Sequence, residues 1–153
     1  MDSCVEQEAL CQALTGYANT PGQFSSHACC RVTRVTRSGE AVGELEVAPE
    51  VLNVWGTVHG GALSTLADTV AGTGVVAATG GACVTVNSSM NYLRPAAGRK
   101  IVCTARPEKL GQHICVMRAV LVNDQGETVS TGEFTFCVIG LLEQVAKERS
   151  SFS

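Results

Sequence analysis

The sequence has few basic residues and no cluster of them. Its 153 residues include 11 Lys and Arg against 14 Asp and Glu, a formal net charge of -3. Such a chain lacks the concentrated positive surface that binds a nucleic-acid backbone or an anionic membrane. We therefore expect no nucleic-acid partner, and a small molecule is the better candidate for a ligand.

Targeting and membrane signals are also missing. The start M-D-S-C-V-E-Q-E has neither the basic n-region nor the apolar h-region of a signal peptide. No apolar run reaches the ~20 residues of a membrane span without a charge or a turn signal. We expect an intracellular protein, in the cytoplasm or the mitochondrial matrix, without a membrane span.

Eight cysteines are present, but their pattern is not that of a disulfide framework or a metal site. Cys83, Cys103, Cys115 and Cys137 each lie in a strand-like apolar run, where a free thiol behaves as a small hydrophobe. We predict reduced core thiols, as is usual inside cells. The adjacent Cys29 and Cys30 near His27 form the only close cluster, which is weak support for zinc, so no metal is expected.

Two catalytic motifs are absent. No G-x-x-x-x-G-K-[ST] occurs, so nucleotide-binding folds have no support. No G-x-S-x-G elbow occurs either, which excludes the α/β-hydrolase route to hydrolysis.

The residues that are present predict one α+β domain. Apolar spacing indicates an N-terminal helix over residues 4–18 that ends at Gly16, and a long helix from Gly61 to about Ala78. Strand patterns cover 29–36, 41–48, 82–94, 99–106, 113–122 and 128–139, with turn chemistry between them. Short connections favour an antiparallel sheet with the long helix on one face. We divide the chain into an N-terminal helix and linker (1–24), a domain (25–140) and a charged, serine-rich tail (141–153) that we expect to fray.

One carboxylate stands alone in the long helix. Between Glu50 and Arg94, Asp68 is the only formally charged side chain. The helix is apolar on nearly every side, which predicts burial on all faces, and a buried carboxylate costs several kcal/mol unless it is paired. Asp68 could cap a local turn or face solvent, but we favour a base or nucleophile in a dry cleft.

The segment T-V-H-G-G at 57–61 comes directly before this helix. Glycines at a helix start allow close approach to the backbone, and the free amide groups there favour developing negative charge. This is the outline of an oxyanion hole, although His59 could also be an ordinary structural histidine. Nine residues separate His59 from Asp68, about two and a half turns and ~13 Å of helix. A helix apolar on all sides also needs a cover besides the sheet, either the N-terminal helix or a second subunit, and we favour the subunit. We therefore expect a two-fold dimer in which Asp68 of one subunit approaches the helix start of the other.

Together these segments resemble a known family. The run N-V-W-G-T-V-H-G-G, with Asp68 fifteen residues after Asn53, and the later V-T-V-N-S-S-M-N-Y-L-R-P-A-A-G are similar to hotdog-fold acyl-CoA thioesterases of the phenylacetate-pathway (PaaI) type. The resemblance covers about residues 30–138. It implies a hotdog fold, in which an antiparallel sheet wraps the long helix, and homodimers that often pair into homotetramers. It also implies an acyl-CoA substrate, a place in fatty acid metabolism, and no cofactor beyond the coenzyme A of the substrate.

The resemblance assigns roles to single residues. Asp68 would activate water or be the nucleophile, and the N–H of Gly60 would polarise the thioester carbonyl. Asn53 would hold the carbonyl or the water, His59 would support the loop and Asn53, and Thr85 would orient water where the family often has Ser. Some relatives carry Asp at the position of Asn87, so no role is assigned there. The residues implied in coenzyme A binding are Gly61, Tyr92, Leu93, Arg94, Lys109, Gly111, Gln112 and His113, with Arg94 and Lys109 as phosphate partners.

Several alternatives stay open at this point. Asp68 could act as general base or form an anhydride. A hotdog hydratase or dehydratase is a second enzyme reading, disfavoured by the opposite-face geometry and by Asn53. A non-catalytic acyl-CoA binding protein is a third. We expect acyl-chain preference to depend on packing around Val70, Gly74, Ala77 and the partner's helix.

Overall fold

The computed structural model describes residues 2–144 and 147 of the chain. The predicted α+β class is confirmed. In chain order the elements are α1 (Asp2–Ala18), α2 (Phe24–His27), β1 (Cys30–Val35), β2 (Ala41–Glu46), the 3-10 turn η1 (Pro49–Val51), α3 (Gly60–Thr79), β3 (Gly81–Tyr92), β4 (Lys100–Leu110), β5 (Ile114–Asn123) and β6 (Thr128–Leu141).

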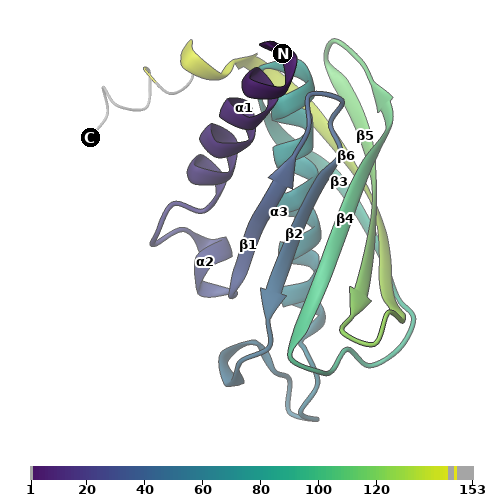
Figure 1. Cartoon of the computed structure of the whole chain (residues 1–153). Helices are drawn as coiled ribbons and strands as arrows, with labels where there is room; N and C mark the ends of the chain where they lie inside the picture. The colour runs from purple at the N-terminus through teal and green to yellow at the C-terminus, as the bar shows by residue number, and fades with distance from the viewer. Residues whose placement is uncertain (1, 145–146, 148–153) are drawn as a thin grey trace.

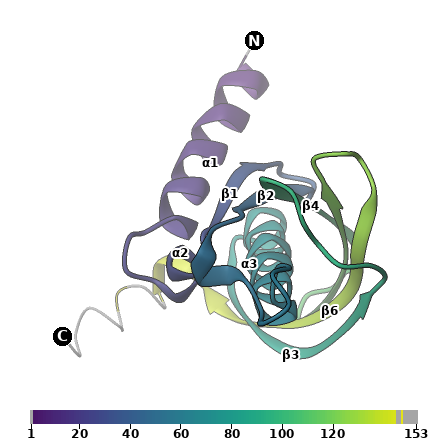
Figure 2. The same ribbon diagram turned by 90° about the horizontal axis from the view of Figure 1, so that it is seen from below.

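The strands form one antiparallel sheet in the order β1-β2-β4-β5-β6-β3. The sheet curves around α3, as Figure 1 and the end-on view of Figure 2 show. Helix α3 contacts every strand of the sheet. The predicted antiparallel sheet around a long central helix is therefore confirmed, and this is the hotdog arrangement.

Sequence order misleads about which strands are neighbours. Short connections suggested that consecutive strands pair, but β3 pairs with β6 at one edge while β4 pairs with β2 and β5. The connection over residues 93–99 instead contacts the loop before α3, where the N–H of Val58 donates to the carbonyl of Ala96 at 2.8 Å. Turn residues predict where a chain reverses, and not which strand it meets next.

Several boundaries also differ from those predicted, most of them by one or two residues. Strand β4 continues through Pro107 to Leu110, because a register shift between Pro107 and Lys109 places the proline in a bulge that needs no amide donor. Lys109 is therefore a strand residue. Helix α1 continues past Gly16 to Ala18, and the short α2 had no sequence signal. Of the tail 141–153, most residues lie outside the described part of the chain.

Helix α3 is well defined at both ends. At its start, Nδ1 of His59 accepts the N–H of Gly61, and at its end Gly80 adopts φ +68° and donates to Val76. Leu66, Val70 and Val75 are fully buried beneath the sheet. Among the described helices, α3 alone has the length and apolar composition to cross a membrane, and half of that segment is buried within its own chain, as in a core helix.

The cysteines are free thiols in the structure. The four that were predicted in strands lie in β3, β4, β5 and β6, and Cys103 and Cys115 have no exposed surface. Burial raises the pKa of the Cys103 thiol to about 12. These thiols pack as small apolar side chains.

The two edges of the sheet differ. Edge strand β1 is covered by α1 (Figure 1). Asn19 donates to the carbonyl of Val32 at 2.7 Å and accepts its N–H at 2.8 Å, and Gln7 donates to the carbonyl of Val35. The other edge, β3, has exposed residues throughout 84–89. A long edge strand without a cover is a template for pairing with another chain.

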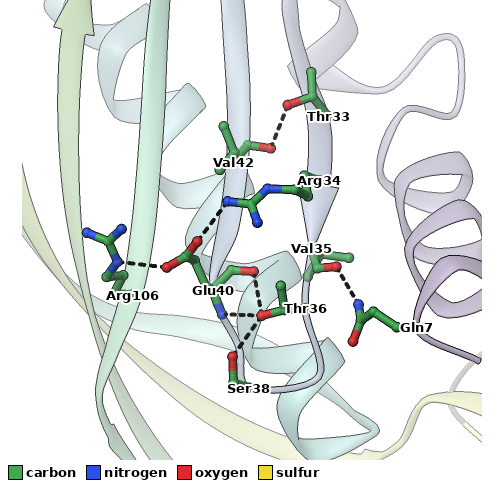
Figure 3. A network of polar contacts seen from close by, with 9 residues as sticks. All are labelled: Gln7, Thr33, Arg34, Val35, Thr36, Ser38, Glu40, Val42 and Arg106. Carbon is green, nitrogen blue, oxygen red and sulfur yellow. Dashed lines mark hydrogen bonds and ion pairs between the residues drawn. The ribbon is translucent and has the colours of Figure 1, made fainter. Parts of the chain in front are cut away.

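A polar network fastens the β1–β2 hairpin to β4 (Figure 3). The Glu40 carboxylate accepts from Arg34 at 2.7 Å and from Arg106 at 2.8 Å. These bonds, that of Arg106 first, lower the pKa of the Glu40 carboxyl. The network lies on the opposite edge from β3.

Candidate active site

Asp68 and Thr85 meet across the interface between α3 and β3. The Thr85 hydroxyl donates to Oδ1 of Asp68 at 2.7 Å. Thr85 is opposite Phe136 of β6, so both side chains lie on the helix-facing side of the sheet. Within the described residues no donor reaches Oδ2, so one carboxylate oxygen is left for a water or a substrate.

Asp68 is half-buried within one chain, on the face of α3 that the prediction assigned to a second subunit. Residues on its side of α3, including Ser64, Thr65, Thr69 and Gly72, are half-buried as well. They recur at three- and four-residue spacing, which places them on one face. The hydroxyls of Thr65 and Thr73 donate to carbonyls four residues earlier, so these two side chains are satisfied within the helix.

This face of α3 forms one wall of a cleft of about 650 Å³. Thr85, Ser88 and two β6 phenylalanines line it from the sheet, and Tyr17 and Phe24 line it from the N-terminal segment. Tyr17 is 52% exposed and Phe24 is 76% exposed, so both stand at an open side. The cleft is large enough for an organic acyl group.

The residues expected to set acyl-chain length do not line this cleft. Val70 is fully buried, and a Cβ on Gly74 would lie 2.4 Å from the carbonyl oxygen of Gly39. Both therefore face the sheet and the β1–β2 turn. Gly72, Thr73 and Val76 line the cleft instead.

Cys83 lies beside the carboxylate and was expected only as a core residue. Its thiol donates to the carbonyl of Gly72 at 3.7 Å. Burial, then Cys115 and then Asp68, raise the pKa of the Cys83 thiol to about 11. A thiol with this pKa is neutral at pH 7, so it supplies a wall of the cleft and no nucleophile.

The start of α3 leaves one backbone donor open. Nδ1 of His59 accepts the N–H of Gly61 at 2.8 Å, so the Gly61 amide is occupied. Among the described residues, none accepts a hydrogen bond from the N–H of Gly60. Of the two glycines, Gly60 is thus the one that offers its N–H to a ligand at the positive end of the helix.

Asn53 is engaged within its own loop. Its Oδ1 accepts the backbone N–H groups of Trp55 at 2.9 Å and Thr57 at 3.2 Å, and its Nδ2 donates to the Thr57 hydroxyl at 2.9 Å. No described bond joins His59 to Asn53, so His59 is a helix cap and not a prop for that side chain. One N–H of the Asn53 amide is left for another acceptor.

A second cleft, of about 390 Å³, lies at the helix start. The Tyr92 hydroxyl donates to the carbonyl of Gly60 at 3.2 Å and contacts Oγ of Ser64 at 2.7 Å. Arg94 pairs with Glu127 at 2.8 Å, and both side chains are nearly half exposed. Five of the predicted residues share this cleft: Asn53, Gly60, Tyr92, Leu93 and Arg94.

The remaining predicted residues lie elsewhere. Gly111, Gln112 and His113 line a third cleft of about 710 Å³, together with residues from the end of α3 and from β6. Lys109 is exposed on β4 outside its lining. Within one chain the predicted site is therefore divided among three places, and Asp68 is with Thr85 but not with Gly60.

Sequence reasoning missed the other residues around Asp68. Ser64, Gly72 and Val76 are four or eight residues from it, so helical spacing could have identified them. Ser88, Tyr17 and Phe24 come from other segments and had no such signal. Their place depends on the curvature of the sheet and on where α1 packs.

Comparisons with known proteins identify the family of the chain. Residues 55–130 match the Thioesterase superfamily. Human acyl-coenzyme A thioesterase 13 is 31% identical over 109 residues, which cover 69% of this chain and 78% of that protein. A hypothetical thioesterase protein of Streptococcus pneumoniae, solved with coenzyme A, has 31% identity and a TM-score of 0.68 over 73% of this chain and 87% of that one. The PaaI protein of the Escherichia coli phenylacetic acid degradation operon has 26% identity and a TM-score of 0.73 over 82% and 91%.

The alignments cover 78% of human acyl-coenzyme A thioesterase 13 and 87% of the Streptococcus pneumoniae protein, and the family match includes α3. The chain therefore belongs to the thioesterase superfamily, as a hotdog-fold acyl-CoA thioesterase of the PaaI type.

Proposed function

We propose that this thioesterase hydrolyses acyl-CoA at a site shared between two copies of the chain. Asp68 and Thr85 of one copy would activate water, and the Gly60 N–H of the other would bind the thioester oxygen. The observation that carries the proposal is the division of the site within one chain.

Helix geometry supports this division. Eight residues separate Gly60 from Asp68 on α3, which is about 12 Å along the axis. The two residues line different clefts. A general base must come within about 3 Å of the proton it takes, directly or through one water. A second chain that supplies the missing partner would relieve this conflict.

The exposed edge of the sheet suggests how the copies meet. Strand β3 carries Thr85 and ends at Tyr92, beside Gly60. Pairing of two β3 strands about a two-fold axis would run the two α3 helices antiparallel. That arrangement would bring each Asp68 toward the other helix start and cover the half-buried face of α3.

The chemistry then needs no metal. Asp68 would take a proton from water held with Thr85, and the hydroxide would add to the carbonyl carbon. The negative charge on the carbonyl oxygen would be held by the Gly60 N–H and the helix dipole. The C–S bond would then break, and the coenzyme A thiolate would take the proton from Asp68. Attack by the carboxylate itself, through an anhydride, is the alternative order of events.

Coenzyme A would bind near the second and third clefts. Arg94, Lys109 and His113 are the candidate partners for its phosphates. Arg94 already pairs with Glu127, so a phosphate would have to compete with that carboxylate or share the guanidinium. The N–H left on Asn53 is a candidate donor to the thioester oxygen or to the water.

The first test is release of free thiol from a panel of acyl-CoAs. Asp68→Asn keeps the shape of the side chain and its hydrogen bond from Thr85. We expect kcat to fall roughly 10²-fold to 10⁴-fold, the range for loss of a general base. Equal rates for wild type and Asp68→Asn would remove Asp68 from the mechanism.

The second test asks whether the site is shared. Gly60→Pro removes the N–H, and His59 already has φ -62° and ψ 136°, which a following proline tolerates at a helix start. Gly60→Ala is the matched control, because it adds bulk near Tyr92 but keeps the N–H. Each of Gly60→Pro and Asp68→Asn should be inactive alone. Randomly mixed subunits should recover roughly a quarter of the wild-type rate, since half the dimers are hybrids with one intact site. Two inactive variants that recover nothing on subunit exchange would show that each site lies within one chain.

A further inference from the structure

We infer that Tyr92 is a positioning residue: its hydroxyl, oriented by Ser64, holds the Gly60–Gly61 peptide so that the Gly60 N–H keeps its direction. This inference rests on the proposed role of Gly60. It gives Tyr92 a different role from the coenzyme A contact that the family resemblance suggested.

Both polar groups of the Gly60–Gly61 peptide form hydrogen bonds to side chains. Its carbonyl oxygen, that of Gly60, accepts from the Tyr92 hydroxyl at 3.2 Å. Its N–H, that of Gly61, donates to Nδ1 of His59 at 2.8 Å. The next donor toward the N-terminus is the Gly60 N–H, which has no acceptor among the described residues. The two anchors therefore fix the peptide beside the open donor.

Two consecutive glycines need such anchors. Glycine has no Cβ and the widest backbone freedom of any residue, and a helix start lacks the hydrogen bonds that hold the interior. An oxyanion donor stabilises a transition state only when it is already aimed at the charge. Tyr92 supplies the missing restraint from β3, 32 residues away in sequence.

The aromatic ring contributes as well. A Cβ on Gly60 would lie 3.3 Å from two carbons of the Tyr92 ring, so the ring packs closely over this glycine. The Tyr92 side chain therefore packs over the Gly60 backbone and also donates a hydrogen bond to it. Tyr92 is still 51% exposed, which leaves its outer edge free.

Ser64 sets the direction of the tyrosine proton. A phenol has one O–H, and in this structure it is directed at the carbonyl of Gly60. The 2.7 Å contact between Ser64 Oγ and Tyr92 Oη then requires the serine hydroxyl to donate. The order of donation is Ser64 to Tyr92 to Gly60, so the series begins and ends on α3, at residues four positions apart.

The test is a kinetic comparison of Tyr92→Phe, Ser64→Ala and the double variant. Tyr92→Phe keeps the ring and removes the hydroxyl. We expect kcat to fall between roughly tenfold and a hundredfold, with KM for acyl-CoA and inhibition by coenzyme A changed less than about twofold. The double variant should be no slower than Tyr92→Phe, because the two hydroxyls act through the same series of hydrogen bonds.

Thr33→Val is the matched control. Its hydroxyl also donates to a backbone carbonyl, that of Val42, but on the opposite edge of the sheet (Figure 3). It should retain wild-type kcat. If Tyr92→Phe raises KM or weakens coenzyme A binding with kcat unchanged, Tyr92 is a substrate contact and the inference fails.

A second measurement does not depend on activity. Amide hydrogen exchange of Gly61, followed by NMR, should accelerate in Tyr92→Phe while amides in the middle of α3 keep their rates. An unchanged exchange rate of the Gly61 amide in Tyr92→Phe would show that Tyr92 does not hold the Gly60–Gly61 peptide. Full activity of Tyr92→Phe beside inactive Asp68→Asn would overturn the inference and leave the proposed function standing, whereas active Asp68→Asn would overturn the proposed function itself.

Discussion

The hydroxyl of Thr85 donates a 2.7 Å hydrogen bond to Oδ1 of Asp68 and so joins edge strand β3 to the middle of α3. This bond occupies one carboxylate oxygen and restricts rotation of the side chain. It also makes the geometry of Asp68 depend on β3, the strand that another copy would contact. Catalysis and assembly would then be coupled through one strand.

Removing this hydroxyl should slow the reaction. Thr85→Val keeps the branched shape, and we expect kcat to fall roughly tenfold to a hundredfold because the carboxylate and its water lose an orienting group. Thr85→Ser keeps the hydroxyl and should stay within about fivefold of wild type. Thiol release from acyl-CoA measures both. A fully active Thr85→Val would mean that the bond is structural only.

A charge on β3 should block assembly. Val86 is 55% exposed on this edge, and an added lysine there opposes pairing with another strand. We expect Val86→Lys to lower the mass in solution to that of one chain and to abolish thiol release. Thr33→Lys, on the covered edge strand β1, is the control. If the wild-type protein sediments with the mass of two chains, the dimer is supported, and the mass of four chains supports the predicted tetramer. A wild-type protein that is active as a single chain contradicts both.

Chain-length preference should follow the cleft and not the buried face of α3. Val76 lines the cleft, so a larger side chain there should obstruct a long acyl chain. We expect Val76→Phe to reduce kcat/KM for long acyl-CoAs by tenfold or more relative to short ones, because each methylene that loses its place in an apolar pocket costs ~1–3 kcal/mol of binding free energy. Val70→Ala should instead cost about 1–3 kcal/mol of stability without changing preference, because Val70 packs against the sheet. Rates across an acyl-CoA series, with urea unfolding of both variants, separate these effects. If Val70→Ala changes the chain-length preference and Val76→Phe does not, the acyl group binds outside this cleft.

The Glu40 network should add a small, pH-dependent contribution to stability. Hydrogen bonds from Arg106 and then Arg34 lower the pKa of this carboxyl. A depressed folded pKa contributes stability above the unfolded value of about 4.3, and the contribution is lost as the pH falls through the folded pKa. Because both arginines are more than half exposed, Glu40→Gln should cost less than ~1 kcal/mol at pH 7 and less still at pH 3. Urea unfolding at both pH values, with Glu50→Gln as the control, gives the difference. A cost that grows on acidification would contradict this account.

Much of the fold could be predicted because it depends on local patterns. Alternation and turn residues predicted all six strands of the sheet, and apolar spacing with Gly80 predicted α3 almost to its ends. Strand β4 was predicted too short because Pro107 usually ends a strand, and only its neighbours could supply the bulge that accommodates it. The position of β3 at the sheet edge depends on α3 crossing the sheet, which no local pattern encodes.

The site was predicted in part for the same reason. The isolation of Asp68 and the glycines before the helix are features of the sequence itself. The use of the Gly61 amide by His59, and of the Gly60 carbonyl by Tyr92, depends on side-chain directions at a helix start and on a strand 32 residues away. Full burial of Asp68 was predicted with a second subunit, so its half-burial in one chain leaves full burial a prediction.

The sequence by itself determined the order of the elements, the single carboxylate of the central helix and the motif that places the chain among the thioesterases. These are properties of residue type and short-range spacing. Only the tertiary structure decided that Thr85 would meet Asp68, that Tyr92 would reach Gly60, and that Asp68 and Gly60 would line separate clefts. Those relations arise from strand register and sheet curvature, which are set by the packing of the whole chain around α3.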